Sequence, residues 1–113
     1  FTEAPPGMLG LETAVAVTMQ LVRDGDLSPL EFIRRLSTNA ARLLRLPGGS
    51  LAEGEPADVV LVDPDHVWTY DPRQGFSKSW NSPYDGAELT GRVIATVVDG
   101  RRVYHHEKGV LIR

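Results

Sequence analysis

Three histidines, His66, His105 and His106, are the side chains of this sequence best suited to metal or acid–base chemistry. Two imidazoles reach one metal ion readily when they are two residues apart on a strand or four apart on a helix, and no pair here has that spacing. The adjacent His105 and His106 point to opposite faces of any strand. We therefore predict no metal ligand in this sequence and interpret the histidines as exposed, with His105 and His106 near the end of a hairpin.

Carboxylates and hydroxyls offer no stronger catalytic group. Glu12 stands beside Thr13 at a predicted helix start, where the helix dipole favours a negative charge, so helix capping is preferred to catalysis and both interpretations stay open. Asp58 and Asp63 flank a predicted strand and are expected to accept hydrogen bonds from loop N–H groups. The run Ser-Lys-Ser at residues 77–79 lacks a third group to orient a nucleophile. We predict no catalytic residue in the chain.

The segment Pro-Pro-Gly at residues 5–7 is the remaining candidate for ligand contact. Gly7 lets a backbone approach a ligand closely, and the prolines stiffen the approach. A rigid loop that enters a helix is the more common role of such a segment.

The apolar residues before residue 47 have the spacing of helices, whereas the sequence after it has Val-rich runs separated by Gly and Pro. Apolar spacing predicts a helix over 11–24, apolar around much of its girth and stopped by Gly25. A second helix is predicted from Pro29 to about residue 36, with Ser28 as N-cap and Glu31 completing a capping box. After a short turn, Thr38 or Asn39 caps a third helix over 40–44, before the break at residues 47–49.

The second half of the sequence predicts strands. Residues 57–64 are predicted to form a buried strand, which ends at the turn-forming residues Asp-Pro-Asp at 63–65. Residues 67–70 are predicted to form a second, short strand. Residues 71–85 are predicted to form a long loop. A hairpin over residues 92–104, turning on Asp99 and Gly100, is the sharpest local signal.

Composition excludes several classes of partner and chemistry. With 12 basic and 15 acidic residues and a net charge of −3, the sequence has no basic segment of the kind that binds nucleic acid or an anionic membrane. No apolar run approaches the roughly 20 residues of a membrane span. The chain has no cysteine, which fits a reducing compartment, and cytoplasmic location is the default expectation. Because the sequence begins at Phe1 and enters a turn directly, we interpret it as a piece of a longer protein.

The order of its motifs resembles the C-terminal part of dihydroorotase, a cyclic amidohydrolase. Gly-Leu-Glu-Thr at residues 10–13 is the most specific match, and the preceding loop has Pro6 where the family usually has Phe. Residues 37–42 resemble a Ser-x-Asn-Pro-Ala-Arg helix start, with Ala40 in place of Pro. The patterns at residues 57–63, 77–86 and 89–100 extend the match, and Ser-x-Asn-Ser-Pro at residues 79–83 favours dihydroorotase over hydantoinase.

The resemblance implies an α/β fold: the C-terminal part of a metal-dependent (β/α)8 barrel, here its closing helices, plus strands of a small β-sandwich side domain. Residues 1–48 would form the substrate loop and closing helices, and residues 49–113 the C-terminal part of the small β domain. Pro6 and Gly7 match the two-residue loop whose backbone contacts substrate, although proline has no N–H to donate.

The same resemblance implies a zinc-dependent parent enzyme that interconverts dihydroorotate and N-carbamoyl-L-aspartate in pyrimidine biosynthesis, with one or two zinc ions held by residues upstream of this sequence. The partners implied are the N-terminal remainder of the same protein, and a second copy or aspartate transcarbamoylase. Alternatives are a catalytically inactive scaffold subunit of aspartate transcarbamoylase, or a hydantoinase or allantoinase relative. We expect the isolated chain to bind no catalytic zinc, to hydrolyse nothing and not to fold alone, because it would leave apolar surface and open strand edges in water.

Overall fold

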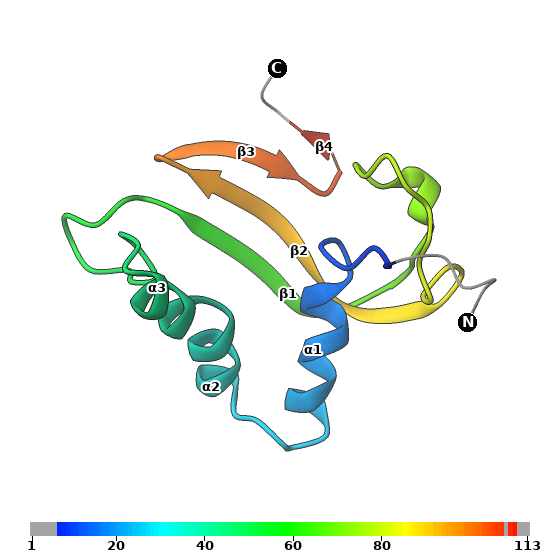
Figure 1. Cartoon of the computed structure of the whole chain (residues 1–113), viewed down its shortest axis with the longest axis horizontal. Helices are drawn as coiled ribbons and strands as arrows, with labels where there is room; N and C mark the ends of the chain where they lie inside the picture. The colour runs from blue at the N-terminus through cyan, green and yellow to red at the C-terminus, as the bar shows by residue number, and fades with distance from the viewer. Residues whose placement is uncertain (1–6, 108, 111–113) are drawn as a thin grey trace.

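The computed structural model describes residues 7–107 and 109–110, which form helices on one side of an antiparallel sheet (Figure 1). The predicted α/β class is thus confirmed. Hydrogen bonding places the strands in the order β1-β2-β3-β4. The elements are α1 (Ala14–Arg23), α2 (Pro29–Ile33), the π-helical segment η1 (Arg34–Thr38), α3 (Asn39–Leu44), β1 (Val59–Thr69), the short 3-10 helix η2 (Pro72–Gln74), β2 (Glu88–Val98), β3 (Arg101–His105) and β4 (Gly109–Val110).

Helix α1 follows the predicted periodicity but begins later than expected. Residues 11–13 form a turn, in which the Thr13 hydroxyl donates to the Gly10 carbonyl at 3.4 Å and Leu11 is 97% exposed. The predicted stop is confirmed, because Gly25 has φ +82° and lies beyond the C-cap residue. The face that carries Ala16 and Met19 is buried.

The second predicted helix start is confirmed, and the predicted turn after it is wrong. The Ser28 hydroxyl accepts from the Glu31 N–H at 3.3 Å while the Glu31 carboxylate accepts from the Ser28 N–H at 3.0 Å, which completes a capping box. The bond from the Ser28 N–H, followed by a bond that the Ser28 hydroxyl donates to the same carboxylate at 2.8 Å, lowers the pKa of Glu31. The chain then stays helical from residue 29 to residue 44 through η1.

Thr38 and Asn39 therefore cap nothing. Thr38 has helical backbone angles, and its hydroxyl donates instead to the Gly49 carbonyl at 3.0 Å. A Cβ atom on Gly49 would lie 2.9 Å from the Ala41 Cβ, so glycine lets the returning chain lie directly on the helix. The wider π turn sits where this tertiary contact is made, which local capping patterns could not indicate. The break predicted at residues 47–49 is confirmed by the end of α3 at Leu44.

Strand β1 merges the two strands predicted from the sequence. The hydrogen bond typical of a turn does form, because the Asp63 carboxylate accepts from the Asp65 N–H at 3.0 Å. It produces a register irregularity within one strand and does not end the strand. The expected burial is wrong for this chain, since Val60 is 53% and Leu61 51% exposed. Within the described residues, the helices cover only part of this strand.

The Asp-Gly hairpin is confirmed. Asp99 and Gly100 have φ of +49° and +73°, and they join β2 to β3 in antiparallel register. The Asp58 carboxylate accepts from the Asp99 N–H at 2.8 Å, as expected of an aspartate at a strand end. Strand β2 begins earlier than the sequence suggested, at Glu88.

The buried core lies where α1 crosses the sheet. Gly91 has φ +95°, and a Cβ atom on it would approach the Met19 sulfur to 3.0 Å, so glycine permits this close helix–sheet packing. The core residues are few: Ala16, Met19, Phe32, Tyr70 and Ala95.

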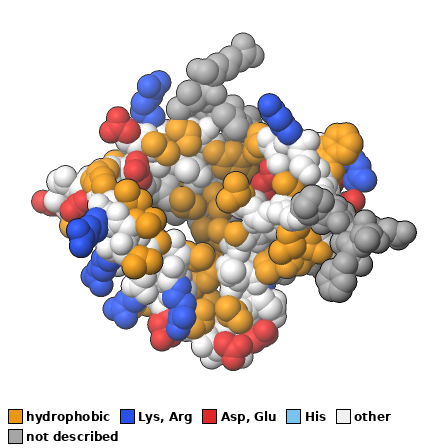
Figure 2. Space-filling model, viewed as in Figure 1, with side chains coloured by type: hydrophobic (Ala, Val, Ile, Leu, Met, Phe, Trp, Pro, Cys, Tyr) orange, Lys and Arg blue, Asp and Glu red, His pale blue; other side chains and the backbone are white. Residues whose placement is uncertain are grey.

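Between the helices and β1 runs an apolar groove (Figure 2). Its volume is about 1140 Å³, and its lining includes Val15, Met19, Phe32, Ile33, Leu36, Val60 and Val62. None of the helices in the described part of the chain is long and apolar enough to cross a membrane.

Candidate functional site

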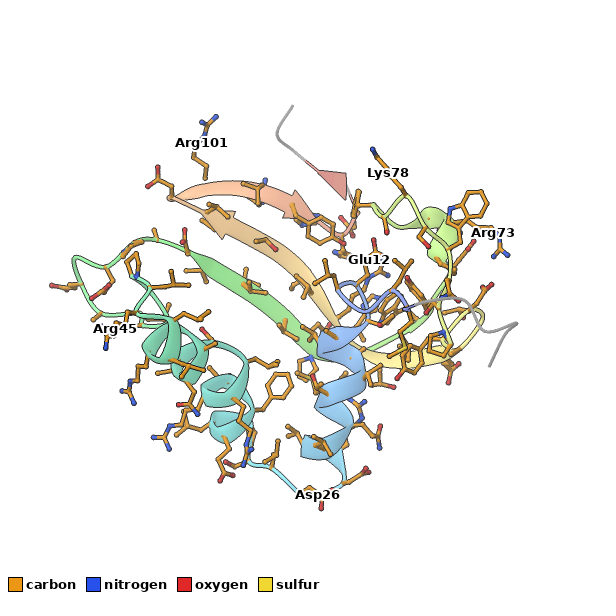
Figure 3. The ribbon with its side chains drawn as sticks, viewed as in Figure 1. Glu12, Asp26, Arg45, Arg73, Lys78 and Arg101 are labelled. Carbon is orange, nitrogen blue, oxygen red and sulfur yellow. The ribbon has the colours of Figure 1, made fainter. Side chains whose placement is uncertain are left out.

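The candidate substrate loop, residues 6 and 7, precedes α1 in the chain, and the structure describes the second of its residues, Gly7. Gly7 is exposed and has φ +74°, a backbone conformation that favours glycine. Pro6 lies outside the described residues. The segment from Gly7 to Glu12 packs beside the loop of residues 71–86, which is distant in sequence (Figure 3).

Asn81 joins these two segments through two of its groups. Its side-chain amide donates a hydrogen bond to the Gly7 carbonyl oxygen. Its own carbonyl oxygen accepts from the Leu9 N–H at 2.8 Å. A single residue thus fixes the backbone of the candidate loop at two points, one on either side of Met8.

Glu12 makes the second connection. Its carboxylate accepts from the Phe76 N–H at 2.6 Å and from the Tyr70 hydroxyl at 3.0 Å. Gly75 leaves the space that this carboxylate occupies, because a Cβ atom there would overlap the carboxylate oxygens. The helix-capping interpretation of Glu12 is therefore wrong: its side chain makes no cap hydrogen bond to α1 and binds a segment more than fifty residues away.

Burial and the Glu12 carboxylate together act on Tyr70. The side chain is 3% exposed. Desolvation by burial, followed by the hydrogen bond to Glu12, raises the pKa of the Tyr70 hydroxyl. The hydroxyl therefore stays protonated and donates to Glu12 at neutral pH.

The loop of residues 71–86 is held closed at its base. The Tyr70 N–H donates to the Ala87 carbonyl at 2.9 Å, and the Gly86 N–H donates to the Tyr70 carbonyl at 2.9 Å. Arg73 bridges Asp71 at 3.4 Å and Asp85 at 3.2 Å. The Arg73 N–H lowers the pKa of Asp71, and the neighbouring Asp85 raises the pKa of Arg73. The candidate loop is thus anchored to a closed support.

A cavity of about 510 Å³ opens where the two segments meet, lined by Met8, Leu9, Gly10, Leu11, Glu12, Phe76 and Ser77. Its walls are mostly apolar, with backbone groups and one carboxylate that already accepts two hydrogen bonds. Such an arrangement can bind and orient a small polar ligand through backbone groups.

The histidines are closer together than the sequence suggested. The rings of His66 and His106 have centroids 5.6 Å apart, and those of His105 and His106 lie 5.3 Å apart. The expectation of exposure is wrong, since all three are half-buried: β1 and the end of β3 bring them together across the sheet. The Nδ1 atom of His106 is buried without a hydrogen-bond partner within the described structure.

Sequence reasoning did not assign a role to Asn81 or Tyr70. Their contacts reach Gly7 and Glu12, which lie far away in the chain, and no local spacing reports such a contact. Among residues 7–107 and 109–110, no three His, Cys, Asp or Glu side chains are grouped so that they could hold a metal ion.

The amidohydrolase family model matches residues 5–103 of this chain, so the chain belongs to the amidohydrolase family. Curated relatives narrow the comparison. The chain is 47% identical over 104 residues to the dihydroorotase of Syntrophotalea carbinolica, covering 92% of this chain and 24% of the relative. It is 44% identical over 105 residues to the dihydroorotase of Clostridium acetobutylicum, covering 92% and 25%. The chain thus spans about a quarter of the length of these relatives.

Solved structures give the same picture of the fold. The L-hydantoinase (dihydropyrimidinase) of Arthrobacter aurescens matches with a TM-score of 0.87 at 31% identity, over 97% of this chain and 25% of that one. The D-hydantoinase (dihydropyrimidinase) of a Thermus species matches with a TM-score of 0.82 at 28% identity, over the same shares of the two chains. The arrangement of helices and sheet is therefore that of the corresponding quarter of a cyclic amidohydrolase.

Proposed function

We propose that this chain is the C-terminal portion of a zinc-dependent dihydroorotase, which hydrolyses dihydroorotate reversibly to N-carbamoyl-L-aspartate. The observation that carries the proposal is its 40–47% identity to dihydroorotases over 89–96% of the chain. Identity to the hydantoinases of similar structure is lower, at 25–31%. The motif Gly-Leu-Glu-Thr, whose glutamate anchors the candidate loop, supports the same assignment.

In this proposal the chain supplies part of the substrate pocket, and the metal centre belongs to the rest of the protein. The described residues do not fit a zinc site of their own, because they lack a suitable group of ligands. One or two zinc ions would be held by upstream residues. Pro6 and Gly7 would contact the pyrimidine ring through backbone groups, beside the cavity of about 510 Å³. Because Pro6 has no N–H, the backbone donors of this contact are those of Gly7 and the residues after it.

We further propose that the remainder of the protein forms most of a (β/α)8 barrel against residues 1–48, and completes the small β domain with residues 49–113. The apolar groove supports this arrangement. Side chains such as Leu36, Val60 and Leu51 are 47%, 53% and 85% exposed along it. An uncovered apolar surface of this kind is typical of an interface, and the curated relatives have about three quarters of their length to place over it.

The experiment is hydrolysis of dihydroorotate by the intact source protein, followed as loss of absorbance of the ring amide, with hydantoin and dihydrouracil as competing substrates. Turnover of dihydroorotate in preference to the other two supports the proposal. Preference for hydantoin or dihydrouracil would assign the protein to the hydantoinases. A folded, inactive protein that binds aspartate transcarbamoylase would assign it to the scaffold subunits. Cytoplasmic location, which the lack of cysteine favours, is checked by cell fractionation.

A further inference from the structure

The contact between Asn81 and the candidate substrate loop fixes more than the position of one atom. The Asn81 side chain donates to the Gly7 carbonyl oxygen. Because a peptide unit is planar and trans, the Met8 N–H of the same unit points away from that carbonyl. Asn81 therefore sets the direction of a backbone donor on the edge of the cavity, where Met8 is 68% exposed.

A second hydrogen bond holds the following peptide unit, Met8–Leu9, to the same residue. The Leu9 N–H donates to the Asn81 carbonyl oxygen at 2.8 Å, so the residues on both sides of Met8 are tied to the same support. Gly7 alone would give the loop wide conformational freedom, because glycine populates positive and negative φ about equally. The Leu9 bond holds only the following peptide unit, so the bond donated by the Asn81 side chain selects the orientation of the Gly7–Met8 unit, with φ +74° at Gly7.

The loop that carries Asn81 is itself held in place by hydrogen bonds. Asn81 lies in the loop of residues 71–86, which is closed by the backbone pairing of Tyr70 with Gly86 and Ala87. Glu12 joins the same loop to the start of α1 through the Phe76 N–H. The candidate loop is consequently ordered before any ligand arrives, and ordering a loop in advance improves affinity by lowering the entropic cost of binding.

Resting on the dihydroorotase function proposed above, we propose that Asn81 is a positioning residue: it pre-organises the Gly7–Met8 peptide unit so that its N–H is directed at the substrate. Asn81 acts through this peptide and does not touch the reacting atoms. Loss of its side-chain donor frees the loop to populate conformations that cannot bind. Apparent affinity falls in proportion to the fraction of loops that stay competent.

The test uses the intact enzyme and the substitutions Asn81→Asp and Asn81→Ala. Asn81→Asp keeps the size of the side chain but faces the Gly7 carbonyl with a carboxylate oxygen, whereas Asn81→Ala only removes the donor. We expect KM for dihydroorotate to rise about tenfold for Asn81→Asp and about threefold for Asn81→Ala, with kcat within about twofold of wild type. Asn39→Asp, the same chemical change at an exposed helical site, is the matched control and leaves KM unchanged.

Stability is measured on the same samples, because a merely structural residue would lower the melting temperature without a selective change in KM. A KM within twofold of wild type for both Asn81 variants, in an enzyme that turns over dihydroorotate, overturns the inference and leaves the proposed function intact. An intact, zinc-loaded wild-type protein without dihydroorotase activity overturns the proposed function, whatever the variants do. If Asn81→Asp does not fold, the Asn81→Ala result decides alone.

Discussion

The Glu12 carboxylate accepts a hydrogen bond from the Tyr70 hydroxyl at 3.0 Å, although 58 positions separate the two residues. Glu12 ends the segment of residues 7–12 that leads into α1, and Tyr70 follows the last residue of β1. The bond therefore ties the candidate substrate loop to the sheet. Since the acceptor is a carboxylate and Tyr70 is buried, the bond is expected to be stronger than one between two neutral groups.

A double-mutant cycle with Glu12→Ala and Tyr70→Phe in the intact protein measures this bond. Each single substitution removes the hydrogen bond, and we expect a coupling of about 2 kcal/mol in the free energy of unfolding, the size of a hydrogen bond to a charged group. Urea denaturation of the four proteins gives the value. Strictly additive effects would mean that the two side chains do not interact in solution.

The raised pKa of Tyr70 predicts a loss of stability at alkaline pH. A folded-state pKa above the unfolded value means that folding favours the protonated hydroxyl, so the stabilisation is complete below about pH 10 and is lost as pH rises through the folded pKa. Thermal melting from about pH 9 to about pH 11.5 checks this, because the steep alkaline decline becomes shallower in Tyr70→Phe. Tyr84→Phe is the control at a half-buried tyrosine. An equal decline in wild type and Tyr70→Phe would contradict the assignment.

Gly75→Ala is expected to displace the Glu12 carboxylate, whose oxygens occupy the space of the new Cβ. The backbone of Gly75 has φ −76°, which alanine adopts without strain, so the effect isolates the overlap. We expect destabilisation by about 1–3 kcal/mol. Gly10→Ala is the comparison, because its Cβ would meet no heavy atom within 4 Å, and its melting temperature should match that of wild type. Equal melting temperatures for both variants would show that Glu12 does not lie over Gly75.

If the remainder of the protein covers the apolar groove, the same substitution at two half-exposed valines should change stability to different extents. Val60 lines the groove and is 53% exposed in this chain, whereas Val98 lies at the end of β2 and is 47% exposed. In the intact protein, Val60→Asp would bury a carboxylate against apolar surface and cost about 3 kcal/mol or more, while Val98→Asp costs much less. Thermal melting compares the two. Similar, small losses would mean that the groove is open to water in the intact protein.

Features governed by neighbouring residues were predictable from the sequence. The Asp-Gly hairpin, the Ser28 capping box and the Gly25 stop depend on residues close together in the chain, and all three are confirmed. The predicted turn near Thr38 is wrong because the backbone stays hydrogen-bonded there, with the Asn39 N–H donating to the Arg34 carbonyl in a π turn. The Thr38 hydroxyl, instead of capping a helix, donates to the Gly49 carbonyl eleven positions away.

In the candidate site, too, the sequence did not predict contacts between residues that are far apart in the chain. Gly7 was identified by a resemblance of motifs, but the residues that hold its loop were not. Asn81 and Glu12 bind partners 74 and 64 positions away, contacts that depend on how α1 and the loop of residues 71–86 pack on the sheet. Periodicity reports which face of an element is apolar; it does not report which loops meet.

The most direct test of the central claim combines three measurements on one preparation of the intact source protein: its mass, its zinc content and its rate of dihydroorotate hydrolysis. We predict a mass several times the 12.4 kDa of this chain, one or two zinc ions per protein and turnover of dihydroorotate. A protein of that size that has no zinc and no turnover, even after zinc is supplied, would contradict the account and indicate a scaffold subunit.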